Sequence, residues 1–152
     1  EAQSGKRVNV DAGDNRSGTY VASGIVEEMG WNGDTDHADE LWIVALGTND
    51  INQYSTGEEL GAAIDSLLAE VPEESEIVWV DTAYVGSADG ADMVNETIAD
   101  RIALRGDSSI AYWSAVAYRD GVLSGDGVHP TEVGSEVFAA TVVAAAADAI
   151  ID

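Results

Sequence analysis

Apolar segments of strand length alternate with amphipathic helical segments along almost the whole chain. The strand-like segments are 7–12, 41–46, 76–81 and 109–117, and the second is a continuous apolar run (LWIVAL). The helical segments are 19–29, 55–71, 89–104 and 131–151, and Ser55 and Glu58 have the spacing of a capping box. This β-α-β-α-β-α-β-α order predicts an α/β fold with a parallel sheet between helical layers.

The composition narrows the classes of function. The 152 residues suit one domain, 1–152, with 45% apolar residues to form its core. A formal charge of −23, with Lys6 as the single lysine, argues against binding nucleic acid or anionic lipid and is typical of a salt-adapted protein. No cysteine is present to supply a disulfide, a thiolate nucleophile or a zinc ligand, and no apolar run approaches the roughly 20 residues of a membrane span.

Two polar motifs lie where a parallel sheet of this kind binds its ligands, beyond the carboxyl ends of the strands. GTND (47–50) follows the second predicted strand, and DGVHP (126–130) precedes the last helix. An asparagine at a strand end can direct its amide at a developing oxyanion, which suits Asn49. Asp126 stands three residues before His129, so its carboxylate can accept from Nδ1–H and leave the other ring nitrogen as a general base toward a serine.

These two motifs, in this order and at these positions, resemble blocks of the SGNH (GDSL-type) esterase and acyl-hydrolase superfamily. The chain is most similar to the SGNH domains at the carboxyl end of membrane-bound polysaccharide O-acyltransferases, to which the segment 10–12, Arg16 and Asn95 also correspond. The resemblance implies a flavodoxin-like three-layer α/β/α fold and an ester hydrolase or O-acyltransferase acting on a small acyl ester, such as an O-acylated glycan. It implies no metal or organic cofactor. It favours an extracytoplasmic location over a cytoplasmic one, and it leaves open whether a membrane acyltransferase domain precedes residue 1.

The site residues that the resemblance implies are His129 as catalytic base, Asp126 as the acid that orients it, and Asn49 as an oxyanion donor. The second oxyanion donor is a backbone N–H. The register of the family segment puts this donor at Asn15, in place of the usual glycine, and Gly13 or Gly18 takes the role if the loop is longer.

The Gly-Asp-Ser nucleophile block of the family should follow the first strand, and no such segment precedes residue 7. A Gly-Asp-Ser triplet does occur at 106–108, but it follows a helix and precedes a strand, so Ser108 should lie at the opposite edge of the sheet from His129. We therefore expect a chain truncated at its amino end by roughly 30 residues. The loss of that first strand should leave a slot between the strands 7–12 and 41–46.

Other residues have simpler interpretations. Asp50 should be structural, the tryptophans at 42, 79 and 113 should pack in the core or on the sheet, and Trp31 stays open. His37 lies in an acidic loop that could bind a cation, although a solvated loop is the favoured interpretation. The alternative function is a catalytically inactive SGNH-like module that binds a glycan or a partner domain.

Overall fold

A three-stranded parallel sheet lies at the centre of the protein. The structure is a computed structural model, and it describes residues 6–9, 17–31, 36–106 and 108–151. The strands are β1 (Leu41–Val44), β2 (Glu76–Val80) and β3 (Ser108–Ala111), in the order β1-β2-β3. Both pairings are parallel. The predicted α/β fold with a parallel sheet flanked by helices is therefore confirmed.

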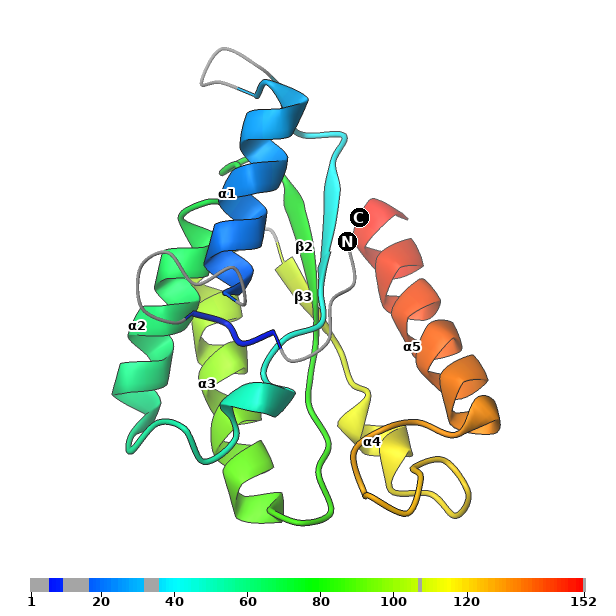
Figure 1. The fold of residues 1–152 in the computed structure, drawn as a ribbon. Helices are drawn as coiled ribbons and strands as arrows, with labels where there is room; N and C mark the ends of the chain where they lie inside the picture. Colours follow the sequence, from blue (N-terminus) through cyan, green and yellow to red (C-terminus); the bar gives the residue numbers. More distant parts are fainter. Residues whose placement is uncertain (1–5, 10–16, 32–35, 107, 152) are drawn as a thin grey trace.

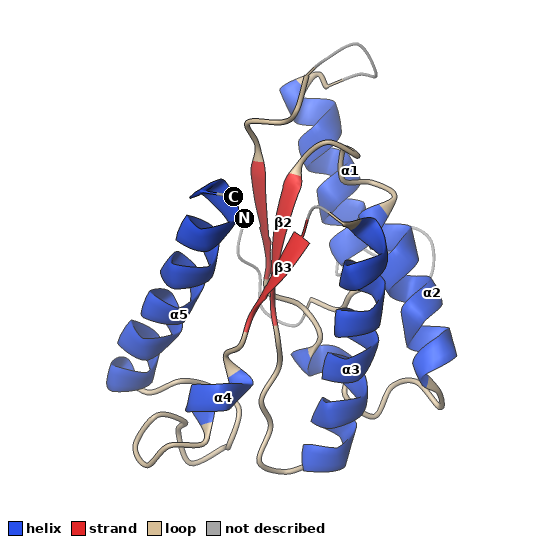
Figure 2. Ribbon diagram, turned by 180° about the vertical axis from the view of Figure 1, so that it is seen from behind, coloured by secondary structure: helices blue, strands red, loops and turns tan. Residues whose placement is uncertain are grey.

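Helices cover both faces of this sheet (Figures 1 and 2). On one side lie α1 (Gly18–Met29), α2 (Gly57–Leu68) and α3 (Ala88–Arg105), and on the other lies α5 (Glu132–Ile151). Two short helices, η1 (Thr48–Asp50) and α4 (Ser114–Ala117), follow the carboxyl ends of β1 and β3. The sheet is thus the middle layer of three.

The central strand β2 is apolar on both faces because each face packs against a helical layer. Ile77 and Trp79 belong to the core shared with α2 and α3 and are fully buried. Val78 and Val80 point the other way and join a second core, on which residues of α5 such as Phe138 pack. The alternation has the two-residue period of a strand, and fully burying each side chain of this size is worth roughly 1.5–3 kcal/mol.

The structure corrects three of the predicted elements. Residues 114–117 form α4 rather than the end of a strand, because Ser114 N–H and its hydroxyl both donate to Asp81 and turn the chain. The N-cap of α2 is Thr56, not Ser55, and it accepts from Glu59 N–H at 3.2 Å. In the predicted strand 7–12 the described residues form only one bridge, between Arg7 and Ser17, and residues 10–12 lie outside the described part.

Helix α5 also corrects the expectation that no run approaches a membrane span. This 20-residue helix contains an 18-residue window with a mean hydropathy of 1.6, so it is long and apolar enough to cross a membrane by length and composition alone. Here α5 packs on the sheet, where Phe138 meets Trp113 edge to face at 5.2 Å. Its outer surface stays apolar, with Val143 and Ile151 exposed.

Candidate functional site

The segments that follow the strands gather at one end of the sheet, the lower end in Figure 1. They are η1 after β1, the segment 81–87 after β2, α4 after β3, and the loop 118–131 that leads into α5. Parallel strands bring their carboxyl ends to the same edge, so GTND and DGVHP lie on one side of the molecule. This shared edge is the candidate site.

The loop that carries His129 is closed by its own hydrogen bonds. Ser124 N–H donates to the carbonyl of His129 at 2.8 Å, and Leu123 forms an antiparallel bridge with Pro130. Gly127 has a φ of 72°, and a Cβ there would come within 2.8 Å of Val85. The turn therefore requires a glycine between Asp126 and His129.

Asp126 holds this loop and the imidazole together. Its Oδ1 accepts from the Ser124 hydroxyl at 2.7 Å, from Val128 N–H at 2.9 Å and from His129 N–H at 3.0 Å. Its Oδ2 lies 2.7 Å from His129 Nδ1. The backbone N–H of Val128, followed by the His129 side chain, holds the pKa of Asp126 well below its usual range. The carboxylate therefore stays ionised at neutral pH.

The ring of His129 is open to approach from solvent. Its side chain is 77% exposed, against 51% for Asp126. With Nδ1 directed at the carboxylate, a neutral ring carries its proton on Nδ1 and presents the lone pair of Nε2 outward. The pair can accept a proton from a hydroxyl and return it.

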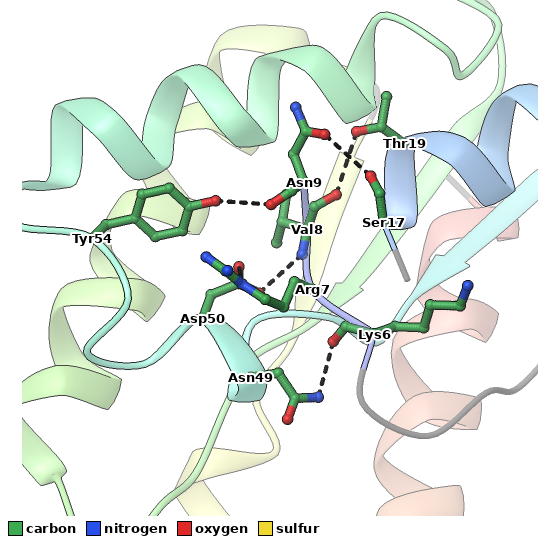
Figure 3. Close-up of polar contacts among 9 residues, drawn as sticks. All are labelled: Lys6, Arg7, Val8, Asn9, Ser17, Thr19, Asn49, Asp50 and Tyr54. Carbon is green, nitrogen blue, oxygen red and sulfur yellow. Dashed lines mark hydrogen bonds and ion pairs between the residues drawn. The ribbon is translucent and has the colours of Figure 1, made fainter. Parts of the chain in front are cut away.

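Asn49 and Asp50 lie on η1, which begins after a glycine with a positive φ. Gly47 has a φ of 128°, and a Cβ there would come within 2.7 Å of Thr82. The amide of Asn49 donates from Nδ2 to the carbonyl of Lys6 at 2.9 Å (Figure 3). One N–H of this amide is therefore used by Lys6, and the amide nitrogen has a second N–H to donate.

Asp50 is fully buried and anchors the segment 6–9 (Figure 3). Its carboxylate accepts from Val8 N–H at 2.9 Å and pairs with Arg7 Nε at 3.4 Å. Burial is the main cause that raises the pKa of Asp50, and the contacts to Val8 and Arg7 oppose it. The contacts are those of the structural residue that the sequence indicated.

The segment 81–87 connects the two motif loops. Val85 N–H donates to the carbonyl of Gly127 at 3.0 Å, which ties it to the His129 loop. Ser87 exchanges hydrogen bonds of 3.0–3.2 Å with Asn52, just beyond η1. A single segment therefore positions both motifs.

Asn95, which the family resemblance singled out, holds this connecting segment in place from α3. Its Oδ1 accepts from Thr82 N–H at 2.8 Å and from the Thr82 hydroxyl at 3.0 Å. Its Nδ2 donates to the Thr82 carbonyl at 2.9 Å. Asn95 thus acts on the backbone between the two motifs, through a contact that no local pattern in the sequence reveals.

The other predicted positions fall as follows. Ser108 begins β3, at the amino edge of the sheet, and its hydroxyl donates to the carbonyl of Ile102 at 2.8 Å. Asn15 and Gly13 lie outside the described residues, and Gly18 is the buried first residue of α1. Ser108 is therefore at the end of the sheet away from the His129 loop, as its position after a helix predicted.

The favoured interpretation of His37 as part of a solvated loop is wrong for this side chain. His37 is buried, packs edge to face on Trp31 at 5.1 Å, and has Nδ1 3.1 Å from Glu40. Trp31 in turn packs on Trp42. Packing against these aromatic residues buries His37. Within the described ranges, no three acidic or histidine side chains lie close enough together to hold a metal ion.

Comparison with known proteins adds no assignment: no protein-family model matches the chain, and no curated protein is significantly similar to it.

Proposed function

We propose that this chain is an SGNH-type ester hydrolase or O-acyltransferase domain that acts on a small acyl ester, such as an O-acylated glycan. The observation that carries the proposal is the Asp126–His129 pair, with Oδ2 and Nδ1 2.7 Å apart, in a loop at the same edge of the sheet as η1, which carries Asn49. The pair supplies a base and an exposed Nε2. The GTND loop supplies an amide donor at the same edge of the sheet.

In the proposed mechanism a serine on a strand upstream of this chain attacks the ester carbonyl. His129 Nε2 takes the serine proton as the C–O bond forms, and Asp126 stabilises the resulting imidazolium. Asn49 Nδ2–H and a backbone N–H near Asn15 stabilise the oxyanion of the tetrahedral intermediate. The leaving alkoxide departs with the proton from His129, which leaves an acyl-serine.

Deacylation uses the same groups a second time and releases the acyl group. His129 removes a proton from water, for a hydrolase, or from an acceptor hydroxyl, for a transferase, and the new oxygen attacks the acyl-serine. The serine oxygen leaves and recovers its proton from His129. No metal or organic cofactor enters either step.

A second candidate is a catalytically inactive SGNH-like module that binds a glycan or a partner domain. The observation in its favour is that, across the part of the chain that the structure describes, no serine hydroxyl bonds to His129. Under this hypothesis the Asp126–His129 pair only closes the loop. Ester hydrolysis by the protein extended with its upstream residues would distinguish the enzyme from the binding module.

The test is hydrolysis of p-nitrophenyl acetate by the protein extended with its upstream residues. His129→Ala should abolish most of kcat, and Asn49→Ala should lower kcat by roughly 10²–10³-fold with little change in KM, because it removes one oxyanion donor. Ser108→Ala is the matched control and should keep full activity. Near wild-type kcat/KM in a folded His129→Ala variant would rule out the hydrolase, and inactivity of the extended protein would favour the binding module.

A further inference from the structure

Tyr118 is an exposed aromatic residue whose side chain is held at both ends. Its backbone caps α4, where its N–H donates to the carbonyl of Val116. Its hydroxyl accepts from Tyr84 N–H at 3.1 Å. The residue is nevertheless 51% exposed. Because a tyrosine side chain has few rotatable bonds, a bond to its hydroxyl fixes the ring, and a ligand that packs on the ring loses little binding energy to ordering it.

This ring borders the loop that carries His129. Tyr118 begins the loop, and the residue after Tyr84, Val85, donates its N–H to the carbonyl of Gly127 at 3.0 Å. The Tyr118 hydroxyl is therefore bound one residue along the backbone from the contact between Val85 and the turn that holds His129. Helix α4 and this loop lie at the same lower end of the molecule in Figure 1. A ligand on the ring would thus lie at the edge where the imidazole is exposed.

Two residues of opposite charge, Arg119 and Asp120, follow Tyr118 in the chain. Both are exposed, and neither side chain forms a hydrogen bond or an ion pair with another described residue. A guanidinium offers only donors and a carboxylate only acceptors. The start of the loop therefore combines an apolar ring with unused donors and acceptors, and the two charges cancel.

These features fit a neutral sugar ring better than a charged ligand. The axial C–H bonds of a pyranose form a flat apolar face, and their weakly positive hydrogens are attracted to the negative face of an aromatic ring. The hydroxyl groups at the rim of the sugar both donate and accept. A cation could also stack on the ring, but Arg119 would repel it. An anion would be repelled by Asp120 and by the net charge of −23.

We propose that Tyr118 is the stacking surface for one pyranose ring of a neutral glycan, and that Arg119 and Asp120 bind the hydroxyl groups of that ring. The assignment of this glycan as the acyl-bearing substrate rests on the proposed function. The sugar, rather than the acyl group, is then the part of the substrate that this edge recognises. Binding of the sugar needs no nucleophile, so the 152-residue chain is sufficient to measure it.

The experiment is a nuclear magnetic resonance titration of this chain with methyl β-D-glucopyranoside. The protons of the axial C–H bonds should shift upfield, because they lie over an aromatic ring, and should receive saturation from tyrosine ring protons. Sorbitol is the matched probe, since it has hydroxyl groups but no rigid C–H face, and it should show neither effect. Choline tests a cationic ligand and should bind more weakly than the glucoside.

Variants test whether the ring of Tyr118 is the contact. Tyr118→Leu, which keeps an apolar side chain without an aromatic face, should raise the Kd of the glucoside roughly tenfold. Tyr118→Phe should weaken binding far less, because the ring remains. Tyr20→Leu is the matched control, since Tyr20 is 57% exposed but lies on α1, across the sheet from α5, and it should leave the Kd unchanged. Asp120→Ala should raise the Kd roughly 3–10-fold, because it removes an acceptor for the sugar hydroxyls.

Several results would overturn the proposal. They are equal saturation of sorbitol and the glucoside, tighter binding of choline, an unchanged Kd in Tyr118→Leu, and a loss in Tyr118→Phe as large as in Tyr118→Leu. An unchanged Kd in Asp120→Ala would overturn the role of that carboxylate.

Hydrolysis by the extended protein separates this inference from the proposed function. Glucoside binding at Tyr118 together with an inactive extended protein supports the sugar contact and contradicts the hydrolase. Hydrolysis of p-nitrophenyl acetate by an extended protein that binds no glucoside supports the hydrolase and contradicts the sugar contact.

Discussion

Asp81 shows how a single buried carboxylate shapes the edge that carries the candidate site. It lies directly after β2, is 6% exposed, and accepts from Ser114 N–H at 2.7 Å and from the Ser114 hydroxyl. Burial is the main cause that raises its pKa, and the Ser114 contacts oppose it. The turn into α4 is therefore made at an electrostatic cost.

This cost predicts a pH dependence. Because the folded state raises the pKa of Asp81, the native state loses stability as the pH rises from the ordinary aspartate value through the raised one. Asp81→Asn can accept from Ser114 N–H and donate to its hydroxyl without a charge. The variant should therefore gain melting temperature relative to wild type as the pH rises from 4 to 8, where 1 kcal/mol corresponds to about 2–4 °C. A difference that is constant over this range, measured by circular dichroism, would contradict the assignment.

The residue contacts that could be predicted are the local ones. Asp126 and His129 are three positions apart in one turn, and their motif alone indicated the hydrogen bond between them. The Asp81–Ser114 pair spans 33 positions, and no local pattern marks it. The burial of His37 was missed for the same reason, since the residues that surround it are brought together by packing.

Among the elements, α1, α2 and α3 were predicted well because each has an apolar stripe of helical period. The start of α1 and the ends of β1 and β2 shifted by one or two residues at most. The amino end of the chain and residues 114–117 were not predictable in this way, because their conformation depends on distant partners. Arg7 and Val8 are held by Asp50, 42 or more positions away.

The contact between α3 and the segment 81–87 supplies a prediction at this scale. Asn95→Ala would leave the Thr82 N–H and C=O without their partners, which should lower the free energy of unfolding by about 1–3 kcal/mol. Asn95→Asp should also destabilise, because the carboxylate cannot donate to the Thr82 carbonyl.

The matched control is Glu96→Ala, on the exposed side of the same helix, with an expected change within about 0.5 kcal/mol. Urea unfolding followed by fluorescence gives all three values. Equal stabilities for Asn95→Ala and Glu96→Ala would mean that Asn95 does not position the segment.

At the scale of the whole molecule, the alternating pattern was sufficient to predict the layers and the parallel sheet. The pattern could not predict what lies beside the outer edge of β1. It predicted a slot between the strands 7–12 and 41–46, whereas in the described residues a cavity beside this edge is walled by α1. The fold thus follows from the periodicities. The open edge follows only from how the strands are ordered in space.

The charge of the whole molecule leads to the last prediction. The chain has twenty-nine acidic residues and six basic ones, and the ion pairs between arginines and acids in the described part include Arg7–Asp50 and Arg101–Asp65. Repulsion among the remaining carboxylates acts over a Debye length of about 30 Å at 0.01 M salt and about 3 Å at 1 M. Raising NaCl from 10 mM to 1 M should therefore raise the melting temperature, whereas sucrose, an uncharged excluded solute, controls for general exclusion. A melting temperature that is flat or falls with NaCl, or that rises no more than with sucrose, would show that the compact state does not depend on screening of its acidic surface.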